Sequence, residues 1–251
     1  MSEPLVFSDR DGRRISGLVD RPASPGSKGV VLCHGLFGFK DSVTNRALSR
    51  LLIERGLTTL RFDFFGHGAS DGTLQELLLT TLIGQTESAL EVMRAQGIAD
   101  VGLLGSSFGG LVAVLVAARV RSLKALALRC PLADFPQLLR QRYGRLAVEL
   151  WRRVGTVPPS IGNVPFHSRF YDDCLQYDAY KAATQVGAPT LIVHGRQDEL
   201  IPLPQVQRIY HSLRAGKLLE LIPSADHRFS RQADFSRMTD QLAGWLVRHV
   251  H

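Results

Sequence analysis

Hydrophobic positions along this chain form short unbroken runs, and longer segments of mixed polarity separate them. Runs of about four to eight apolar residues are typical of strands in a parallel sheet that helices cover on both faces. We predict strands over residues 29–33, 58–64, 101–104, 125–128, 189–193 and 218–222. Helical spacing follows most of them, and a closing helix is predicted over 235–250. The alternation predicts an α/β fold with a mostly parallel central sheet and helices on both faces.

Two stretches depart from this alternation. Near the N-terminus, apolar residues 5–7 and 15–19 flank Asp11-Gly12, a strong signal for a two-residue hairpin turn. Residues from about 134 to 186 lie between two predicted strands and are richer in aromatic, proline and arginine residues. We interpret this second stretch as a small inserted cap within one domain that spans residues 1–251.

Composition narrows the class of protein. Apolar residues make up 45% of the chain and charged residues 21%, as in ordinary globular proteins. No apolar run approaches the roughly 20 residues of a membrane span, and the N-terminus lacks the pattern of a secretory signal. We therefore expect no membrane association and a cytoplasmic location. The three cysteines show no metal-binding spacing, so we expect buried, reduced thiols and no metal site.

The net charge of +7 comes mainly from arginine and is spread over the whole chain. No zinc finger, helix-turn-helix or aromatic RNA-binding motif accompanies it, so we expect no nucleic-acid partner. Five arginines are concentrated in the cap: Arg140, Arg142, Arg145, Arg152 and Arg153. Two interpretations stay open, a solvated helix face or a rim that attracts acidic groups. Whether the protein forms a homodimer stays open at this point.

The clearest catalytic motif is Gly105-Ser106-Ser107-Phe108-Gly109, which fits G-x-S-x-G. It follows a predicted strand and opens an apolar helix, which is the context that the motif requires. The serine of such a turn sits on strained backbone, so the positions two residues away on either side must be small. The sequence therefore predicts Ser107 as a nucleophile above the sheet edge.

A serine nucleophile generates an oxyanion that preset N–H donors must stabilise. The residue after the nucleophile supplies one donor, which predicts the N–H of Phe108. The second is expected from the loop after an earlier strand. His34-Gly35-Leu36-Phe37-Gly38 follows the strand over 29–33, and we assign this donor to Leu36.

A histidine must take the serine proton, and a carboxylate must orient that histidine. The chain order expected for this kind of turn is serine, acid, histidine. Of the eight histidines, His227 lies in a loop directly after the last predicted strand, and the other seven lie in less suitable contexts. For the acid we favour Asp198, which follows the strand over 189–193, with Glu199 and Asp226 as rivals.

Together these residues resemble the α/β-hydrolase superfamily over almost the entire chain. The matching segments are His34-Gly35, residues 62–72, residues 105–109, residues 194–198 and Ala225-Asp226-His227. The segment over 62–72, the short cap and the Ala-Asp-His ending are similar to small bacterial carboxylesterases, including cinnamoyl (feruloyl) esterases. Many of these relatives carry histidine at the position of Ser106.

The resemblance implies hydrolysis of a small-molecule carboxylic ester through an acyl-enzyme, without a cofactor. It implies Ser107 as nucleophile, His227 as general base and then general acid, and Asp198 as the residue that stabilises the imidazolium. A thioesterase, a peptidase or a cofactor-free haloperoxidase on the same fold stays open, as does an inactive interaction protein. A dehalogenase is disfavoured because that chemistry needs aspartate at the nucleophile position.

The cap is where we expect substrate choice to be determined, because insertions above a rigid scaffold vary freely. Its aromatic residues are candidates for lining an acyl or aromatic pocket: Trp151, Phe166, Phe170, Tyr171 and Tyr177. We take Trp151, Phe170 and the carboxylate of Asp134 as candidate substrate-binding groups.

Overall fold

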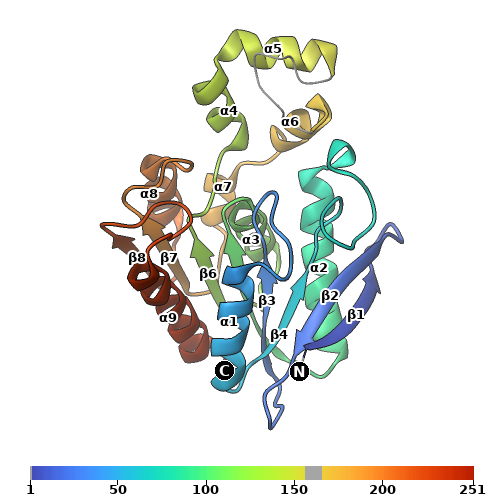
Figure 1. Cartoon of the computed structure of the whole chain (residues 1–251), viewed down its shortest axis with the longest axis vertical. Coiled ribbons are helices and arrows are strands. Elements are labelled where there is room, and N and C mark those ends of the chain that lie inside the picture. The colour runs from blue at the N-terminus through green and yellow to red at the C-terminus, as the bar shows by residue number, and fades with distance from the viewer. Residues whose placement is uncertain (1, 156–165) are drawn as a thin grey trace.

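The computed structural model describes residues 2–155 and 166–251. Its centre is an eight-stranded sheet in the order β1-β2-β4-β3-β5-β6-β7-β8 (Figure 1). The strands are β1 (Ser2–Ser8), β2 (Arg14–Asp20), β3 (Lys28–Cys33), β4 (Thr58–Phe62), β5 (Asp100–Ser106), β6 (Ala125–Arg129), β7 (Thr190–Gly195) and β8 (Lys217–Ile222). Strand β2 pairs antiparallel with β1 and β4, and the pairs from β4 to β8 are parallel. The predicted α/β-hydrolase fold, with its mostly parallel sheet, is confirmed.

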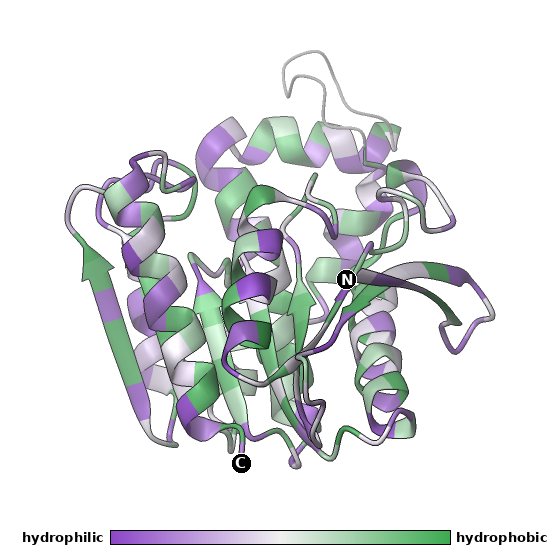
Figure 2. Ribbon diagram, turned by 60° about the horizontal axis from the view of Figure 1, so that its bottom comes forward, coloured by the Kyte–Doolittle hydropathy of each residue, from purple (hydrophilic) through white to green (hydrophobic). Residues whose placement is uncertain are grey.

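Helices cover both faces of this sheet. Helices α1 (Val43–Glu54) and α9 (Gln232–His249) pack together on one face, and α2 (Leu79–Ala95) and α3 (Phe108–Arg119) pack together on the other. The short helix η1 (Leu74–Glu76) precedes α2, and α8 (Leu203–Ser212) follows β7. Figure 2 shows hydrophobic strands at the centre, flanked by helices that contain both hydrophilic and hydrophobic residues. Among the described residues, no helix is long and apolar enough to cross a membrane.

Alternating side chains of the strands build two hydrophobic cores. In β6, Leu126 and Leu128 belong to the core beneath α2 and α3, while Ala125 and Ala127 belong to the core beneath α1 and α9. All four are fully buried. Because both faces of β6 are covered, its sequence is apolar at successive positions, which is the pattern from which the strand was predicted.

The segment between β6 and β7 carries α4 (Phe135–Tyr143), α5 (Arg145–Val154), α6 (Ser168–Cys174) and α7 (Ala179–Ala183). Helices α4 to α6 stand above the sheet as a cap (Figure 1). Helix α7 instead packs against α3 and α8 of the body. Residues 156–165 of the predicted cap lie outside the described residues.

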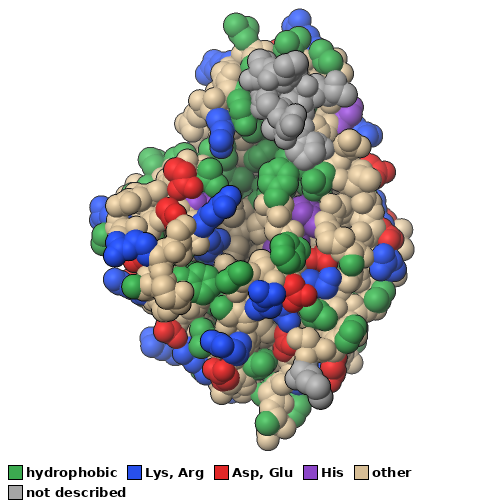
Figure 3. Space-filling view, viewed as in Figure 1, with side chains coloured by type: hydrophobic (Ala, Val, Ile, Leu, Met, Phe, Trp, Pro, Cys, Tyr) green, Lys and Arg blue, Asp and Glu red, His purple; other side chains and the backbone are tan. Residues whose placement is uncertain are grey.

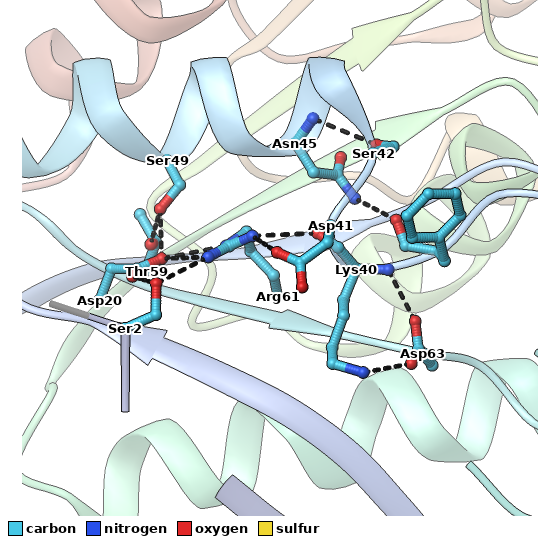
Figure 4. A network of polar contacts seen from close by, with 11 residues as sticks. Ser2, Asp20, Lys40, Asp41, Ser42, Asn45, Ser49, Thr59, Arg61 and Asp63 are labelled. Carbon is cyan, nitrogen blue, oxygen red and sulfur yellow. Dashed lines mark hydrogen bonds and ion pairs between the residues drawn. The ribbon is translucent and has the colours of Figure 1, made fainter. Parts of the chain in front are cut away.

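A buried polar network ties the loop after β3 to β2 and β4 (Figure 4). The guanidinium of Arg61 donates to Asp20 at 3.0 Å and to Asp41 at 2.6 Å, and the Ser49 hydroxyl donates to Asp20 at 2.6 Å. Burial raises the pKa of Asp20, but hydrogen bonds from Ser2 and Ser49 and the charge of Arg61 outweigh it and lower the pKa overall. The network therefore fixes the loop after β3 at the edge of the sheet where the parallel strands end.

Candidate active site

Ser107 occupies the turn between β5 and α3 with φ of 54° and ψ of −117°. A non-glycine residue in this region of positive φ stores about 1–3 kcal/mol of strain. The turn is held because the Ser107 N–H donates to the Arg129 carbonyl at 2.8 Å. A Cβ at position 105 would lie 2.3 Å from the Gly109 carbonyl oxygen, so the glycine spacing follows from close backbone packing.

The structure brings Ser107, His227 and Asp198 into one hydrogen-bonded chain. The Nε2 atom of His227 lies 3.1 Å from the Ser107 Oγ, and its Nδ1 atom lies 2.7 Å from the Asp198 Oδ2. The other carboxylate oxygen of Asp198 accepts the N–H groups of Leu200 at 2.9 Å and Ile201 at 2.8 Å. These bonds fix the carboxylate, which in turn orients the imidazole toward the serine hydroxyl.

The surroundings keep Asp198 ionised and the neighbouring His194 neutral. Burial raises the pKa of Asp198, but the hydrogen bonds from His227 and from the Ile201 N–H outweigh it, so the pKa lies below its ordinary value. The Nδ1 atom of His194 lies 3.6 Å from the same carboxylate. Burial lowers the pKa of His194 more than Asp198 raises it, so His194 does not add a competing positive charge.

The two rival acids take other roles. Glu199 accepts the backbone N–H of His227 at 3.2 Å. Asp226 accepts the backbone N–H and the hydroxyl of Ser230, at 2.9 and 2.6 Å, and so closes the turn after His227. Of the three carboxylates weighed from the sequence, Asp198 is the one hydrogen-bonded to the imidazole.

The loop after β3 lies directly against the nucleophile turn. A Cβ at position 35 would lie 3.2 Å from the Ser107 Cβ, and Leu36 lines the same cavity as Ser107. Phe108, the first residue of α3, also lines this cavity. N–H groups in the first turn of a helix lack intrahelical acceptors, so that of Phe108 is a free donor by position.

His34 connects the loop after β3 to the segment after β4. Its Nδ1 atom lies 2.7 Å from the Gly35 carbonyl oxygen, and its Nε2 atom accepts the Phe64 N–H at 3.0 Å. The first contact requires a proton on Nδ1 and the second a lone pair on Nε2, so the ring is neutral. Burial, aided by the nearby His67, lowers the pKa of His34 to about 4.

Asp63 connects the same loop to the motif over 62–72, as part of the network in Figure 4. Its carboxylate accepts the Lys40 N–H at 2.7 Å and the Ala69 N–H at 3.0 Å, and it pairs with the Lys40 ammonium. A Cβ at position 68 would lie 2.1 Å from this carboxylate, which explains the glycine there. Asp71 accepts the Arg14 N–H at 2.8 Å. Both aspartates therefore hold turns.

Ser107 and His227 open into a cavity of about 520 Å³ between the body and the cap. One part of its lining is apolar: Leu36, Phe37, Phe108, Leu132, Phe135, Leu138, Leu139, Phe166, Leu200 and Ile201. The lining also contains three arginines, Arg129, Arg142 and Arg228, and no Asp or Glu among the described residues. Figure 3 shows the hollow, with hydrophobic side chains inside it and Lys or Arg side chains along one edge.

The three candidate substrate-binding residues from the cap are not among the described residues that line this cavity. Asp134 begins α4, where its carboxylate accepts the Gln137 N–H at 2.8 Å. Trp151 is fully buried and packs edge-on against Tyr171. Phe170 is fully buried behind Phe135, with ring centroids 5.1 Å apart. They support the cap, and Phe135 and Phe166 reach the cavity instead.

Arg129 is a charged cavity residue that was not predicted from the sequence. It ends a strand that is otherwise apolar, and its Nη2 group donates to the His227 carbonyl oxygen at 2.6 Å. Burial lowers its pKa, opposed by the charges of nearby acidic groups. An arginine closing a buried run was a usable signal, because a charged residue at a parallel strand end points to the functional edge of the sheet.

One group of side chains has the composition of a metal site. Ligand atoms of Cys130, Asp198 and His227 lie within 4.8 Å of one another. Burial raises the pKa of the Cys130 thiol, although metal binding requires the thiolate. Asp198 and His227 are already hydrogen-bonded to each other, so their geometry is better accounted for by the chain that ends at Ser107.

Comparison with known proteins agrees with the fold. Residues 30–243 match the family model described as "Alpha/beta hydrolase family". The uncharacterized protein YfhR of Escherichia coli O157:H7 is 25% identical over 237 residues, which cover 90% of this chain and 73% of YfhR. Est1E from Butyrivibrio proteoclasticus, solved with ferulic acid bound, superposes with a TM-score of 0.83 at 23% identity, covering 98% of this chain and 99% of Est1E. Mouse alpha/beta hydrolase domain-containing protein 10 gives a TM-score of 0.80 at 20% identity, with coverages of 98% and 99%.

Proposed function

The chain belongs to the alpha/beta hydrolase family, and from that premise we propose that it is a serine hydrolase that cleaves carboxylic esters through an acyl-enzyme intermediate. The observation that carries the proposal is the hydrogen-bonded chain from the Ser107 hydroxyl through the His227 imidazole to the Asp198 carboxylate. Ser107 and His227 line a cavity of about 520 Å³, which is within the usual size of small-molecule sites. A hydroxyl, an imidazole and a buried carboxylate in this order generate a nucleophile at neutral pH.

In the first half-reaction, the Ser107 Oγ attacks the ester carbonyl while the Nε2 atom of His227 takes the hydroxyl proton. Asp198 stabilises the imidazolium that forms. The backbone N–H groups of Leu36 and Phe108 are assigned to the tetrahedral oxyanion, where each donor contributes about 3–4 kcal/mol to the transition state. His227 then gives its proton to the departing alcohol, leaving the acyl group on Ser107.

In the second half-reaction, His227 takes a proton from a water molecule that attacks the acyl carbonyl. Collapse of the new tetrahedral intermediate returns the proton to Ser107 and releases the acid. Each step uses groups of the chain itself, and the proposed reaction requires no cofactor. Ester cleavage is favoured over other acyl transfers because the cavity is largely apolar and the structurally similar Est1E was solved with ferulic acid.

The test is hydrolysis of p-nitrophenyl acetate, butyrate and octanoate and of methyl ferulate by wild type and Ser107→Ala. We expect Ser107→Ala to lose at least about 10⁴-fold in kcat, because no other group replaces the nucleophile. Ser212→Ala removes an exposed hydroxyl on α8 and serves as the matched control. Wild type should also react with a fluorophosphonate probe, and Ser107→Ala should not.

Two results would contradict this proposal. A folded wild-type protein that hydrolyses no ester and resists the probe would indicate an inactive interaction protein on this fold. Faster cleavage of butyrylthiocholine or a CoA thioester than of every oxygen ester would keep Ser107 as nucleophile and change the reaction to thioester hydrolysis.

A further inference from the structure

Arg129 is a charged side chain in the interior of the molecule, at the edge of the catalytic cavity. It is 8% exposed and lines that cavity. Its Nη2 group donates to the His227 carbonyl oxygen, and its guanidinium lies 5.2 Å from the ring centre of Phe229. These two contacts account for one donor group and one face of the guanidinium.

The remaining donors of Arg129 have no protein partner among the described residues. Its Nε atom is buried without a hydrogen bond, and Nη1 makes none. No carboxylate of the described residues lies within 4.0 Å of its guanidinium. Residues 156–165 contain no Asp or Glu in the sequence. Asp198 and Asp226 act on the guanidinium only through longer-range charge interactions. A buried cation that no carboxylate contacts directly is costly, since burial removes its hydration.

Two other side chains near the cavity, Ser106 and Arg228, would also suit a bound anion. Ser106 faces Arg129 across the pairing of β5 and β6, and its hydroxyl is buried without a hydrogen-bond partner. Arg228 follows the catalytic histidine, is exposed and lines the same cavity. None of the described lining residues is Asp or Glu, so a negative group in the cavity contacts no carboxylate of the wall.

We propose that Ser106, Arg129 and Arg228 form a subsite for a carboxylate group carried by the substrate. This inference deepens the proposed function and rests on it. The planar guanidinium matches a carboxylate in shape, and a hydroxyl supplies a further donor. The apolar lining on the cap side takes the rest of the molecule. The substrate class is therefore an ester that carries a hydrophobic group and a carboxylate, such as the monoester of a dicarboxylic acid.

A structural role for Arg129 is the competing explanation, because its bond to the His227 carbonyl positions the catalytic loop. The two roles predict different effects of an Arg129 substitution on charged and neutral substrates. A positioning residue affects all substrates alike through kcat, whereas a carboxylate subsite changes the ratio between charged and neutral substrates.

The experiment compares two matched ester pairs. One carries the carboxylate on the acyl side: p-nitrophenyl hydrogen glutarate against p-nitrophenyl pentanoate. The other carries it on the alcohol side: 4-acetoxybenzoate against its methyl ester. We expect wild type to prefer the carboxylate in one pair by about 10- to 100-fold in kcat/KM, the usual contribution of hydrogen bonds to a charged group. Equal or lower activity on the charged member of both pairs would overturn the subsite.

The variants separate the subsite from general damage. Arg129→Gln should abolish the preference, Arg129→Lys should retain part of it, and Ser106→Ala and exposed Arg228→Gln should each reduce it. Arg145→Gln removes the same charge from the exposed start of α5, outside the cavity lining, and should leave the preference intact. If Arg129→Gln lowers kcat on charged and neutral esters equally, Arg129 is a positioning residue and the subsite is wrong.

A binding measurement keeps this inference separate from the ester hydrolase proposal. In Ser107→Ala, calorimetry should show that 4-phenylbutyrate binds at least about 10-fold more tightly than 4-phenylbutyramide, and that Arg129→Gln removes the difference. Such binding without ester hydrolysis by wild type would contradict the proposed reaction and keep the carboxylate site. Hydrolysis of neutral esters by wild type, with no difference in binding between the two ligands, would contradict the carboxylate site and keep the proposed reaction.

Discussion

A Cβ atom at position 109 would lie 2.3 Å from the carbonyl oxygen of His34. Gly109 therefore sets how closely the start of α3 approaches the loop after β3. That approach brings the nucleophile turn and the proposed oxyanion donors to the same point above the sheet. Gly109 acts through backbone packing and is not among the described residues that line the cavity.

Gly109→Ala should destabilise the fold by about 1–3 kcal/mol or more, because the contact with backbone atoms cannot be relieved by a side-chain rotation. Hydrolysis should fall sharply, since the Leu36 loop and Ser107 move apart. Urea denaturation and ester kinetics measure the two effects.

Gly84→Ala is the matched control. Gly84 lies inside α2, and a Cβ there would meet nothing within 4 Å. This change should raise the free energy of unfolding by about 0.5–1 kcal/mol, as alanine does in a helix interior. Equal losses in both variants would contradict the role assigned to Gly109.

Most of the fold was predictable because the sheet is buried on both faces. Strands β3, β5, β6 and β7 each contain a run of apolar residues, so sequence pattern and burial report the same constraint. The cap lacks this property, because its helices are short, and α4 and α5 bury only three and two residues. The aromatic residues of the cap predicted a pocket lining, yet Trp151 and Phe170 turn into the cap itself.

Ser107, Asp198 and His227 could be found from the sequence because each lies just after a predicted strand, and parallel strands end at one edge. Arg129 also directly follows a predicted strand, but this position alone does not indicate its role. Its relation to Ser106 depends on the register between β5 and β6, and the absence of a direct carboxylate partner depends on which acidic residues other loops bring near. Both are properties of the folded chain that a residue pattern does not contain.

The neutral ring of His34 makes a prediction about acid stability. Its pKa is about 4 in the folded chain, whereas an unfolded histidine titrates near 6.5. Between these values the unfolded state binds more protons, so the free energy of unfolding falls as the pH is lowered through this window. The His34 contribution to that fall is about 3 kcal/mol and levels off below about pH 4.

Chemical denaturation of wild type and His34→Gln at pH 7 and pH 4.5 tests this prediction. The variant should be less stable at pH 7, because glutamine cannot replace both the bond to Gly35 and the bond from Phe64. Its loss of stability on acidification should be smaller than that of wild type. An identical loss in both proteins would show that His34 is not the titrating group.

Asp63→Asn should destabilise the protein by about 3 kcal/mol, because it leaves the Lys40 ammonium without its partner. The carboxylate is 1% exposed and the lysine side chain 14% exposed, so water replaces the pairing poorly. The loop that carries Leu36 should also loosen, and kcat should fall.

The double variant Asp63→Asn with Lys40→Met should be more stable than Asp63→Asn alone, since it removes the unpaired charge. Asp71→Asn is the control within the same motif. Asp71 is 44% exposed and pairs with Arg14, so its loss should cost less than about 1 kcal/mol. A comparable effect of both single changes would rule out a special role for the buried pair.

The cavity wall predicts how acyl length is selected. Phe135 lines the cavity and packs against Phe108, with ring centroids 5.6 Å apart, whereas Phe170 lies behind it and does not reach the cavity. Phe135→Leu should enlarge the site and raise the octanoate-to-butyrate ratio of kcat/KM by about 10-fold, within the range for added methylenes in a hydrophobic pocket.

Phe170→Leu removes the same atoms from the same aromatic cluster. It should lower stability by about 1–2 kcal/mol and leave the ratio unchanged, because the new space is not open to substrate. If both variants shift the ratio equally, the cap responds as a whole and the lining residues do not set acyl length individually.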